Sequence, residues 1–131
     1  MTKEHLRLID ANLNRLREGI RVVEDIYRYI FNDKNIASKL KTLRHNSRIS
    51  QYEELLNSRD IKNDVLKTST SSEQSREDLN SILIANFKRA QESSRVLEEF
   101  GKLIDTDTTT SENFKNIRYT LYDLEKSIIL N

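Results

Sequence analysis

Apolar residues recur at the three- and four-residue spacing of a helix in four stretches of the chain. The first stretch runs from about Lys3 to Phe31. Its apolar stripe consists of Leu6, Ile9, Leu13, Leu16, Ile20, Val23, Tyr27 and Ile30. Asn32 interrupts the pattern, and Asp33 is placed to cap a second helix that extends to about Leu56. The first half of the chain is therefore predicted to be a pair of helices.

The second half repeats this arrangement. Either Ser72 or Ser75 can cap a third helix that reaches about Ile104. A DTDTTTS segment then breaks the apolar pattern, and Ser111 at its end can cap a last helix that runs to Leu130. A second pair of helices is predicted here.

The two halves also resemble each other in sequence. Residues 11–30 read ANLNRLREGIRVVEDIYRYI, and residues 85–104 read ANFKRAQESSRVLEEFGKLI. Between these segments the identical residues are Ala11, Asn12, Arg15, Glu18, Arg21, Val22, Glu24 and Ile30 in the first, and Ala85, Asn86, Arg89, Glu92, Arg95, Val96, Glu98 and Ile104 in the second. At the same offset, Leu40, Lys41, Leu43 and Arg44 align with Phe114, Lys115, Ile117 and Arg118. A helical hairpin that occurs twice explains both observations.

Two hairpins that each expose an apolar face can bury those faces against each other. We therefore expect an all-α fold, a four-helix bundle with approximate two-fold symmetry, in one domain that spans residues 1–131. Hairpin one covers about 3–56 and hairpin two about 73–130. Residues 57–72 between them show no sustained period and end in a Ser/Thr cluster, which predicts a loop.

Much of what the repeat preserves is polar. Asn12, Arg15, Glu18, Arg21 and Glu24 follow one another at steps of three residues, so they wrap around the first helix. One interpretation is a set of exposed ion pairs on the helix surface, each worth only a few tenths of a kcal/mol. The expected pairs are Glu18 with Arg21, Arg21 with Asp25, and Glu24 with Arg28.

The other interpretation is a binding site. Asn is a poor helix former, yet Asn12 and Asn86 recur mid-helix, each with an arginine one turn later. An amide and a guanidinium on adjacent turns suit the edge of a heteroaromatic ring or a phosphate. This interpretation predicts one polar cleft. Its walls would be Asn12, Arg15 and Glu18 on one side, and Asn86, Arg89 and Glu92 on the other.

Gly19 and its counterpart Ser93 add a second clue. Glycine inside a helix costs about 1 kcal/mol relative to alanine, so a compensating gain is expected. A close crossing of the first and third helices would provide it, and space for a bound ligand is the alternative.

The loop carries charges of both signs at Arg59, Asp60, Lys62 and Asp64. A solvated connector is the ordinary interpretation. The functional one is a lid, in which Asp60 and Asp64 supply oxygen ligands for Mg²⁺ while Arg59 and Lys62 contact phosphate.

Composition narrows the class of protein. The 131 residues contain no cysteine or proline and two glycines, and 22 basic residues nearly balance 21 acidic ones. These values exclude disulfides and thiolate metal sites and give no basic stripe for nucleic acid. The chain shows neither a signal peptide nor an apolar run long enough to span a membrane, so we expect a cytoplasmic protein. No glycine-rich phosphate loop is present either.

Five stretches resemble a known family. They are IDANLNRLREGIRVVEDIYR, LRHN, SRDIKNDV, IANFKRAQESSRVLEEFGKL and IRYTLYDLEK. They are similar to the small helical phosphomethylpyrimidine kinase domain of bacterial thiamine biosynthesis, which occurs alone or fused in front of thiamine phosphate synthase. The likeness runs from about Leu6 to Lys126. It implies phosphorylation of 4-amino-5-hydroxymethyl-2-methylpyrimidine phosphate to the diphosphate, with ATP and Mg²⁺ as cofactors.

Residue roles for such an enzyme follow from the chemistry of the side chains. The phosphates would be neutralised by Arg15, Arg21, Arg89 and Arg95, together with Arg59 from the loop. Asn12 or Asn86 would contact the aminopyrimidine edge. The catalytic group would comprise Glu18, Glu92 and Asp60, which orient the phosphoryl acceptor or hold Mg²⁺, and the metal ligands would be Asp60 and Asp64.

A second hypothesis belongs to a different class of function. The chain would be a non-catalytic helical module that binds thiamine phosphate synthase. It predicts a measurable complex without nucleotide turnover. The oligomeric state is left open, a homodimer included.

Overall fold

The computed structural model describes residues 1–131 apart from the side chain of Ser72. Every regular element in this described part is helical, which confirms the all-α class. The elements are α1 (Lys3–Asp25), the π-helix η1 (Ile26–Ile30), α2 (Lys34–Asn46), α3 (Tyr52–Ser58), α4 (Ser71–Gln74), α5 (Leu79–Gly101) and α6 (Thr109–Ile129).

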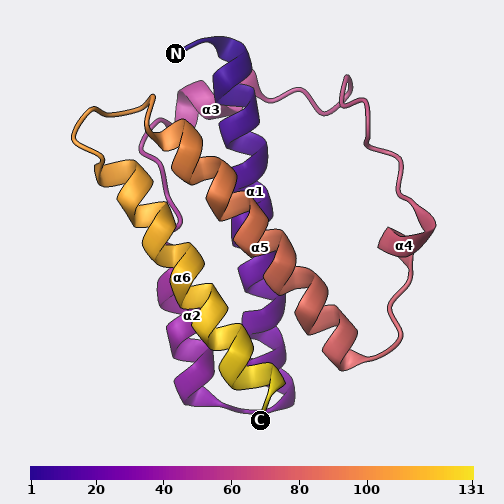
Figure 1. Cartoon of the computed structure of the whole chain (residues 1–131). Helices are drawn as coiled ribbons and strands as arrows, with labels where there is room; N and C mark the ends of the chain where they lie inside the picture. Colours follow the sequence, from indigo (N-terminus) through magenta and orange to yellow (C-terminus); the bar gives the residue numbers. More distant parts are fainter.

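The two longest helices, α1 and α5, cross at the centre of the molecule and form its most extensive interface (Figure 1). Helix α2 packs on α1, α6 packs on α5, and α2 touches α6. The side chains most fully buried between them include Ile9, Leu16, Ile20, Leu40, Phe87, Leu97, Phe114 and Leu121. The N-terminus and the C-terminus lie at opposite ends of this assembly.

Gly19 lies at the crossing of α1 and α5. A Cβ atom at this position would stand 3.0 Å from the backbone oxygen of Asn86 and 3.4 Å from the Cβ of Ala90. The close approach of the two helices explains the glycine, and it offsets the helix-propensity cost of about 1 kcal/mol.

A buried ion pair holds each pair of antiparallel helices together. Glu24 on α1 accepts two hydrogen bonds from Arg44 on α2, at 2.6 and 3.1 Å. Glu98 on α5 accepts one from Arg118 on α6, at 2.8 Å. Both glutamates and both arginines are repeat-related, so part of the repeated polar pattern is structural.

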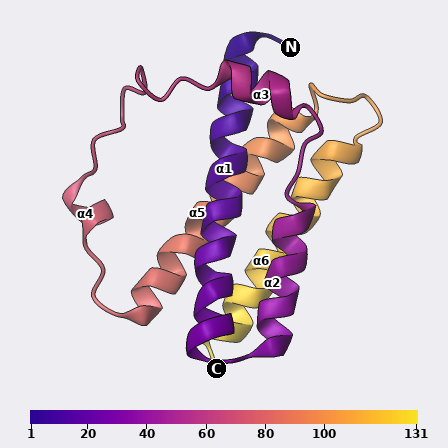
Figure 2. The ribbon, with the colours of Figure 1, turned by 180° about the vertical axis from the view of Figure 1, so that it is seen from behind.

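The two halves of the chain nevertheless differ beyond the residues that form these ion pairs. The predicted second helix, which was to reach Leu56, ends at Asn46. The buried Ser47 donates its hydroxyl proton to the Leu43 carbonyl, the chain turns, and α3 then covers the N-terminal half of α1 (Figure 2). Helix α6 runs unbroken over the corresponding stretch. A two-fold bundle of equal hairpins therefore stays a prediction.

The start of the third long helix also differs from the expectation. Helix α5 begins at Leu79, where Asp78 accepts a hydrogen bond from the Ser81 amide and supplies the cap. The predicted cap Ser75 instead directly follows the short helix α4, where its backbone is extended. The side chain of Ser72 lies outside the described residues. An Asp cap satisfies the same free amides as a Ser cap, so the sequence offered competing choices.

Helix α6 begins at Thr109, two residues before the predicted cap Ser111. Thr108 takes the capping position in a left-handed conformation, with φ of 64°. Ser111 lies inside the first turn and donates its hydroxyl proton to the Thr108 carbonyl. The Ser111 cap is therefore wrong, whereas the predicted Asp33 cap of α2 is confirmed by its hydrogen bond from the Ile36 amide at 3.0 Å.

The connector from Arg59 to Asp78 leaves the body of the molecule and returns to the start of α5 (Figures 1 and 2). All of residues 61–70 are exposed, and the Val65 side chain is 93% accessible to solvent. The predicted loop at 57–72 thus corresponds to irregular chain at 59–70, followed by the unforeseen helix α4.

Candidate functional site

Two adjoining clefts lie on one side of α1. The first, which we call the mixed cleft, has a volume of about 430 Å³. It is lined by Glu4, Arg7, Leu8, Asp10, Ala11, Asn12, Asn14, Arg15, Arg59, Asp60, Ile61 and Asp64. The second, the basic cleft, has a volume of about 450 Å³. It is lined by Asn12, Arg15, Arg76, Ala85, Lys88, Arg89, Glu92, Ser93 and Val96. Asn12 and Arg15 belong to both.

Asn12 forms part of the wall between the clefts. The residue is buried, and its side-chain amide donates to the Leu8 carbonyl one turn earlier, at 2.9 Å. Asn86 makes the same bond to the Ile82 carbonyl at 2.9 Å, but it lines neither cleft. Of these two repeat-related residues, Asn12 is therefore the one that can contact a ligand in the clefts.

Arg15 and Arg89 face the basic cleft from α1 and α5. Both residues are exposed, and neither forms an ion pair or a side-chain hydrogen bond with another described residue. Glu92 lines the same cleft one turn beyond Arg89. Together with Asn12, four of the predicted site residues therefore line the basic cleft.

The mixed cleft owes its shape to a pair that sequence reasoning missed. Asp10 is buried on α1 and accepts two hydrogen bonds from Arg59, at 2.8 and 2.9 Å. Arg7 donates to the Asp60 backbone oxygen at 2.9 Å. These contacts fasten the start of the connector to α1. The repeat does not indicate Asp10, because the counterpart of this residue in the second half, Ile84, is apolar.

The predicted metal ligands Asp60 and Asp64 both line the mixed cleft. Asp60 accepts hydrogen bonds from the side chain and backbone of Asn63, at 2.7 and 3.2 Å, which lower the pKa of its carboxyl group below the ordinary value. Asp64 accepts one from the Leu66 amide at 3.0 Å. Two carboxylates beside a phosphate are a donor set that Mg²⁺ takes in proteins. The described residues contain no cluster of three or more metal-ligating side chains, so the Mg²⁺ site stays a prediction.

Four residues of the predicted site lie away from both clefts: Glu18, Arg21, Asn86 and Arg95. Arg21 pairs with Asp25 at 3.3 Å, as the surface interpretation expected. Arg95 pairs with Glu98 and Glu99 at 3.1 and 2.9 Å. The repeated polar residues therefore divide between the clefts, the buried ion pairs and the helix surface.

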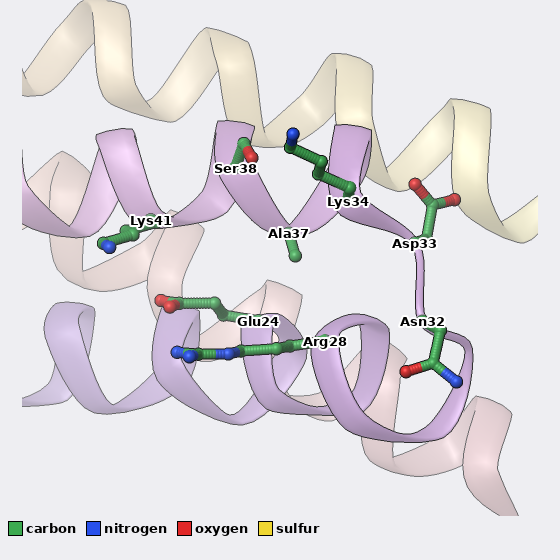
Figure 3. Close-up of a pocket in the computed structure, with 8 residues that line it drawn as sticks. All are labelled: Glu24, Arg28, Asn32, Asp33, Lys34, Ala37, Ser38 and Lys41. Carbon is green, nitrogen blue, oxygen red and sulfur yellow. The ribbon is translucent and has the colours of Figure 1, made fainter.

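A third pocket, of about 290 Å³, lies between the end of α1 and the start of α2 (Figure 3). Glu24, Arg28, Lys34 and Lys41 are among its lining residues, and none of the predicted site residues lines it. Figure 3 shows the Glu24 side chain of α1 and the Arg28 side chain of η1 extending in parallel. Since Arg44 already binds the Glu24 carboxylate, this pocket belongs to the pairing of α1 with α2.

Among the described helices, none is both long and apolar enough to cross a lipid bilayer. No solved structure shows significant similarity to the chain.

Several proteins with related sequences carry the name thiamine-phosphate synthase. A thiamine-phosphate synthase of Thermosynechococcus vestitus is 43% identical over 126 residues, which cover 95% of this chain and 35% of that protein. The thiamine-phosphate synthase of Rhodopirellula baltica is 40% identical, with 89% and 32% covered, and that of Synechocystis sp. is 38% identical, with 94% and 36% covered. The chain thus spans about a third of the length of these relatives.

The family match includes the connector, the basic cleft and all of the mixed cleft except Glu4. The model of the ThiD2 family matches residues 7–127, a range that includes Asp10, Arg15, Arg59 and Arg89. On this match over nearly its whole length, the chain belongs to the ThiD2 family.

Proposed function

We propose that this chain is a helical module of thiamine biosynthesis that works together with thiamine-phosphate synthase. The support is that relatives bearing this synthase name contain a version of the chain as about a third of their length. The rest of such a protein must then carry other parts of the function. The module would contribute either a reaction of its own or a non-catalytic contact.

For the reaction, we propose phosphorylation of the pyrimidine monophosphate. The observation that carries this proposal is the wall formed by Asn12 and Arg15, which two adjoining clefts share. The proposed phosphoryl transfer joins two phosphorylated ligands, whose reacting atoms must approach to roughly 3–3.5 Å. Neighbouring clefts with a common arginine support such an arrangement without a glycine-rich loop, since the chemistry depends mainly on positioning and charge neutralisation.

The step is a simple exchange of one bond for another. The bond between the γ-phosphorus of ATP and the β,γ-bridging oxygen breaks, and a bond forms from that phosphorus to an oxygen of the acceptor phosphate. The products are ADP and the pyrimidine diphosphate. A phosphate monoester has its second pKa near 6, so the attacking oxygen is already ionised at neutral pH and needs no strong base.

Side chains at the two clefts then have separate tasks. Asn12 would contact the aminopyrimidine edge, and Arg15 and Arg89 would neutralise phosphate charge. Glu92 would hold Mg²⁺ from the basic cleft. Asp60 and Asp64 would hold Mg²⁺, which neutralises the transferring group when it is bound.

The test of the reaction uses purified chain, the pyrimidine monophosphate, ATP and Mg²⁺, with ³¹P NMR to follow the products. We expect the diphosphate and ADP to appear in equal amounts. Arg15→Ala should lower kcat/KM by about a hundredfold or more, a loss typical of one group that stabilises transition-state charge. Absence of diphosphate with the synthase both present and omitted would exclude the kinase.

The non-catalytic alternative has its own measurement. A groove of about 290 Å³ between α5 and α6 suits a docking module. Its lining combines the exposed apolar side chains of Ile84, Tyr122 and Leu130 with the charged ones of Lys88, Glu125 and Lys126. Size-exclusion chromatography of the chain with a separate thiamine-phosphate synthase should give a complex if the module acts by contact. Turnover by the isolated chain without any complex would decide for the enzyme.

A further inference from the structure

The two clefts differ in the charge that they present to a ligand. Three basic side chains and four carboxylates line the mixed cleft. Four basic side chains and one carboxylate line the basic cleft. Fixed charges in a concave site raise the local concentration of ligands of the opposite sign. The basic cleft is therefore the better site for a group with several negative charges.

The positive groups of the basic cleft come from three parts of the chain. Arg15 projects from α1, Lys88 and Arg89 from α5, and Arg76 from the end of the connector. Arg15 and Arg89 have no acidic partner among the described residues, so no ion pair must break before they bind an anion. Lys88 pairs with Glu125 at 3.3 Å, which steers its ammonium group towards α6.

The mixed cleft contrasts with this arrangement. Two of the three guanidinium nitrogens of its Arg59 donate to Asp10, and a cation held by Asp60 and Asp64 would offset the charge of about one phosphate. Apolar atoms of Leu8 and Ile61 contribute to the same walls. This combination suits a small heteroaromatic ring with one phosphate.

We propose that the basic cleft binds the polyphosphate chain of the phosphoryl donor, and that the mixed cleft binds the phosphorylated pyrimidine. The assignment rests on the proposed kinase function. Arg15, which lines both clefts, contacts the phosphate groups of both ligands where they meet. The volume of about 450 Å³ falls in the range of small-molecule sites.

Binding measurements without turnover test this assignment. Inorganic tripolyphosphate serves as the probe for the basic cleft, and the pyrimidine monophosphate serves for the mixed cleft, each titrated by calorimetry. Arg89→Ala and Arg76→Ala should each weaken tripolyphosphate binding about tenfold or more, the loss expected for one charged partner. Both variants should leave the affinity for the pyrimidine monophosphate within about twofold, and Arg59→Ala should show the reverse pattern.

Arg48→Ala is the matched control, because it removes one exposed arginine that lines neither cleft. It should leave both affinities unchanged. The proposal is overturned if the wild-type chain does not bind tripolyphosphate, or if Arg89→Ala binds it as tightly as wild type. The proposal is also overturned if Arg59→Ala weakens tripolyphosphate binding as much as Arg89→Ala does.

The outcome for the kinase is read separately. Tripolyphosphate binding that depends on Arg89, without any diphosphate in the assay, would keep the polyphosphate site and reject the reaction. If diphosphate forms but neither Arg89→Ala nor Arg76→Ala weakens tripolyphosphate binding, the reaction is supported and the polyphosphate site is rejected. Melting temperatures without ligand confirm that each variant is folded, as expected for the exposed Arg89.

Discussion

At the scale of single residues, Gly19 sets how closely α1 and α5 approach. A branched side chain there would meet the Asn86 backbone oxygen, which belongs to a helix and cannot move aside. We expect Gly19→Val to lower the free energy of unfolding by about 1–3 kcal/mol, the usual cost of overpacking. Urea unfolding measures this change.

The control for this variant is Lys39→Val. Lys39 lies on the exposed face of α2, so valine there changes only helix propensity, by less than about 0.7 kcal/mol. Equal losses for the two variants would show that the crossing tolerates a larger side chain.

Glu24 and Glu98 make stability depend on pH. Burial alone would raise the pKa of each carboxyl group, but the hydrogen bonds and positive charges of Arg44 and Arg118 outweigh it, so both pKa values lie below the ordinary 4.5. Groups with lowered pKa values stabilise the fold above the unfolded value and lose that contribution as the pH falls through the folded value. The free energy of unfolding should therefore be steady near neutral pH and decline below about pH 4.5.

Removing one partner of a buried ion pair tests how much that pair contributes to stability. Arg44→Ala leaves the Glu24 carboxylate, which is 1% exposed, without its cation. We expect a loss of about 3–5 kcal/mol at pH 7, and a smaller one at pH 3, because burial favours the protonated form of a carboxyl group that has lost its cation. Arg48→Ala should stay within about 0.5 kcal/mol of wild type. An equal loss for Arg44→Ala at both pH values would contradict the electrostatic account.

At the scale of elements, the connector is the part with the weakest ties to the rest. Residues 61–70 are exposed throughout, whereas α1 and α5 bury most of the core. Trypsin should therefore cut after Lys62 or Lys67 before it cuts in any long helix. Because α1 and α5 belong to different fragments, the two pieces should elute together in size-exclusion chromatography. Separation of the pieces would show that the connector contributes to cohesion, and earlier cleavage at Lys39 in α2 would show that the connector is not the most weakly held part.

The helices themselves were largely predictable from their apolar spacing, and the break between α2 and α3 was not. Residues 47–51 contain no glycine or proline that would mark it. The break depends on a tertiary circumstance, since the chain must turn after Ser47 for Leu55 to reach the core and for Arg59 to reach Asp10. Local propensity contains no information about a partner 49 positions away.

At the scale of the whole molecule, the clefts should couple anion binding to stability. Four basic side chains around one cleft repel one another, and a bound anion relieves that repulsion. A ligand at about a hundred times its Kd adds about 2.7 kcal/mol to the free energy of unfolding. Millimolar pyrophosphate should therefore raise the melting temperature by several degrees, and Arg15→Ala or Arg89→Ala should abolish that rise. A similar rise with chloride at equal ionic strength would indicate screening alone.

The repeat allowed part of the candidate site to be predicted. It identified Asn12, Arg15, Arg89 and Glu92, because both copies keep these residue types. It also selected Asn86 and Arg95, which the structure uses for helix packing and surface pairs. Identity between copies cannot separate a residue retained for folding from one retained for binding. Asp10 shows the opposite limit, since its role depends on a connector that occurs once.

Under the proposed kinase reaction, the positions of the two termini affect how a longer protein of this family would pass on the diphosphate. The mixed cleft lies beside the N-terminal half of α1, while the last residues lie at the other end of the molecule (Figure 1). Helix α1 alone accounts for a separation on the order of 30 Å. A catalytic domain attached after the last residue would then receive the pyrimidine diphosphate by diffusion through solvent. Fusion would raise the local concentration of this intermediate, as a tether does, without enclosing it in a tunnel.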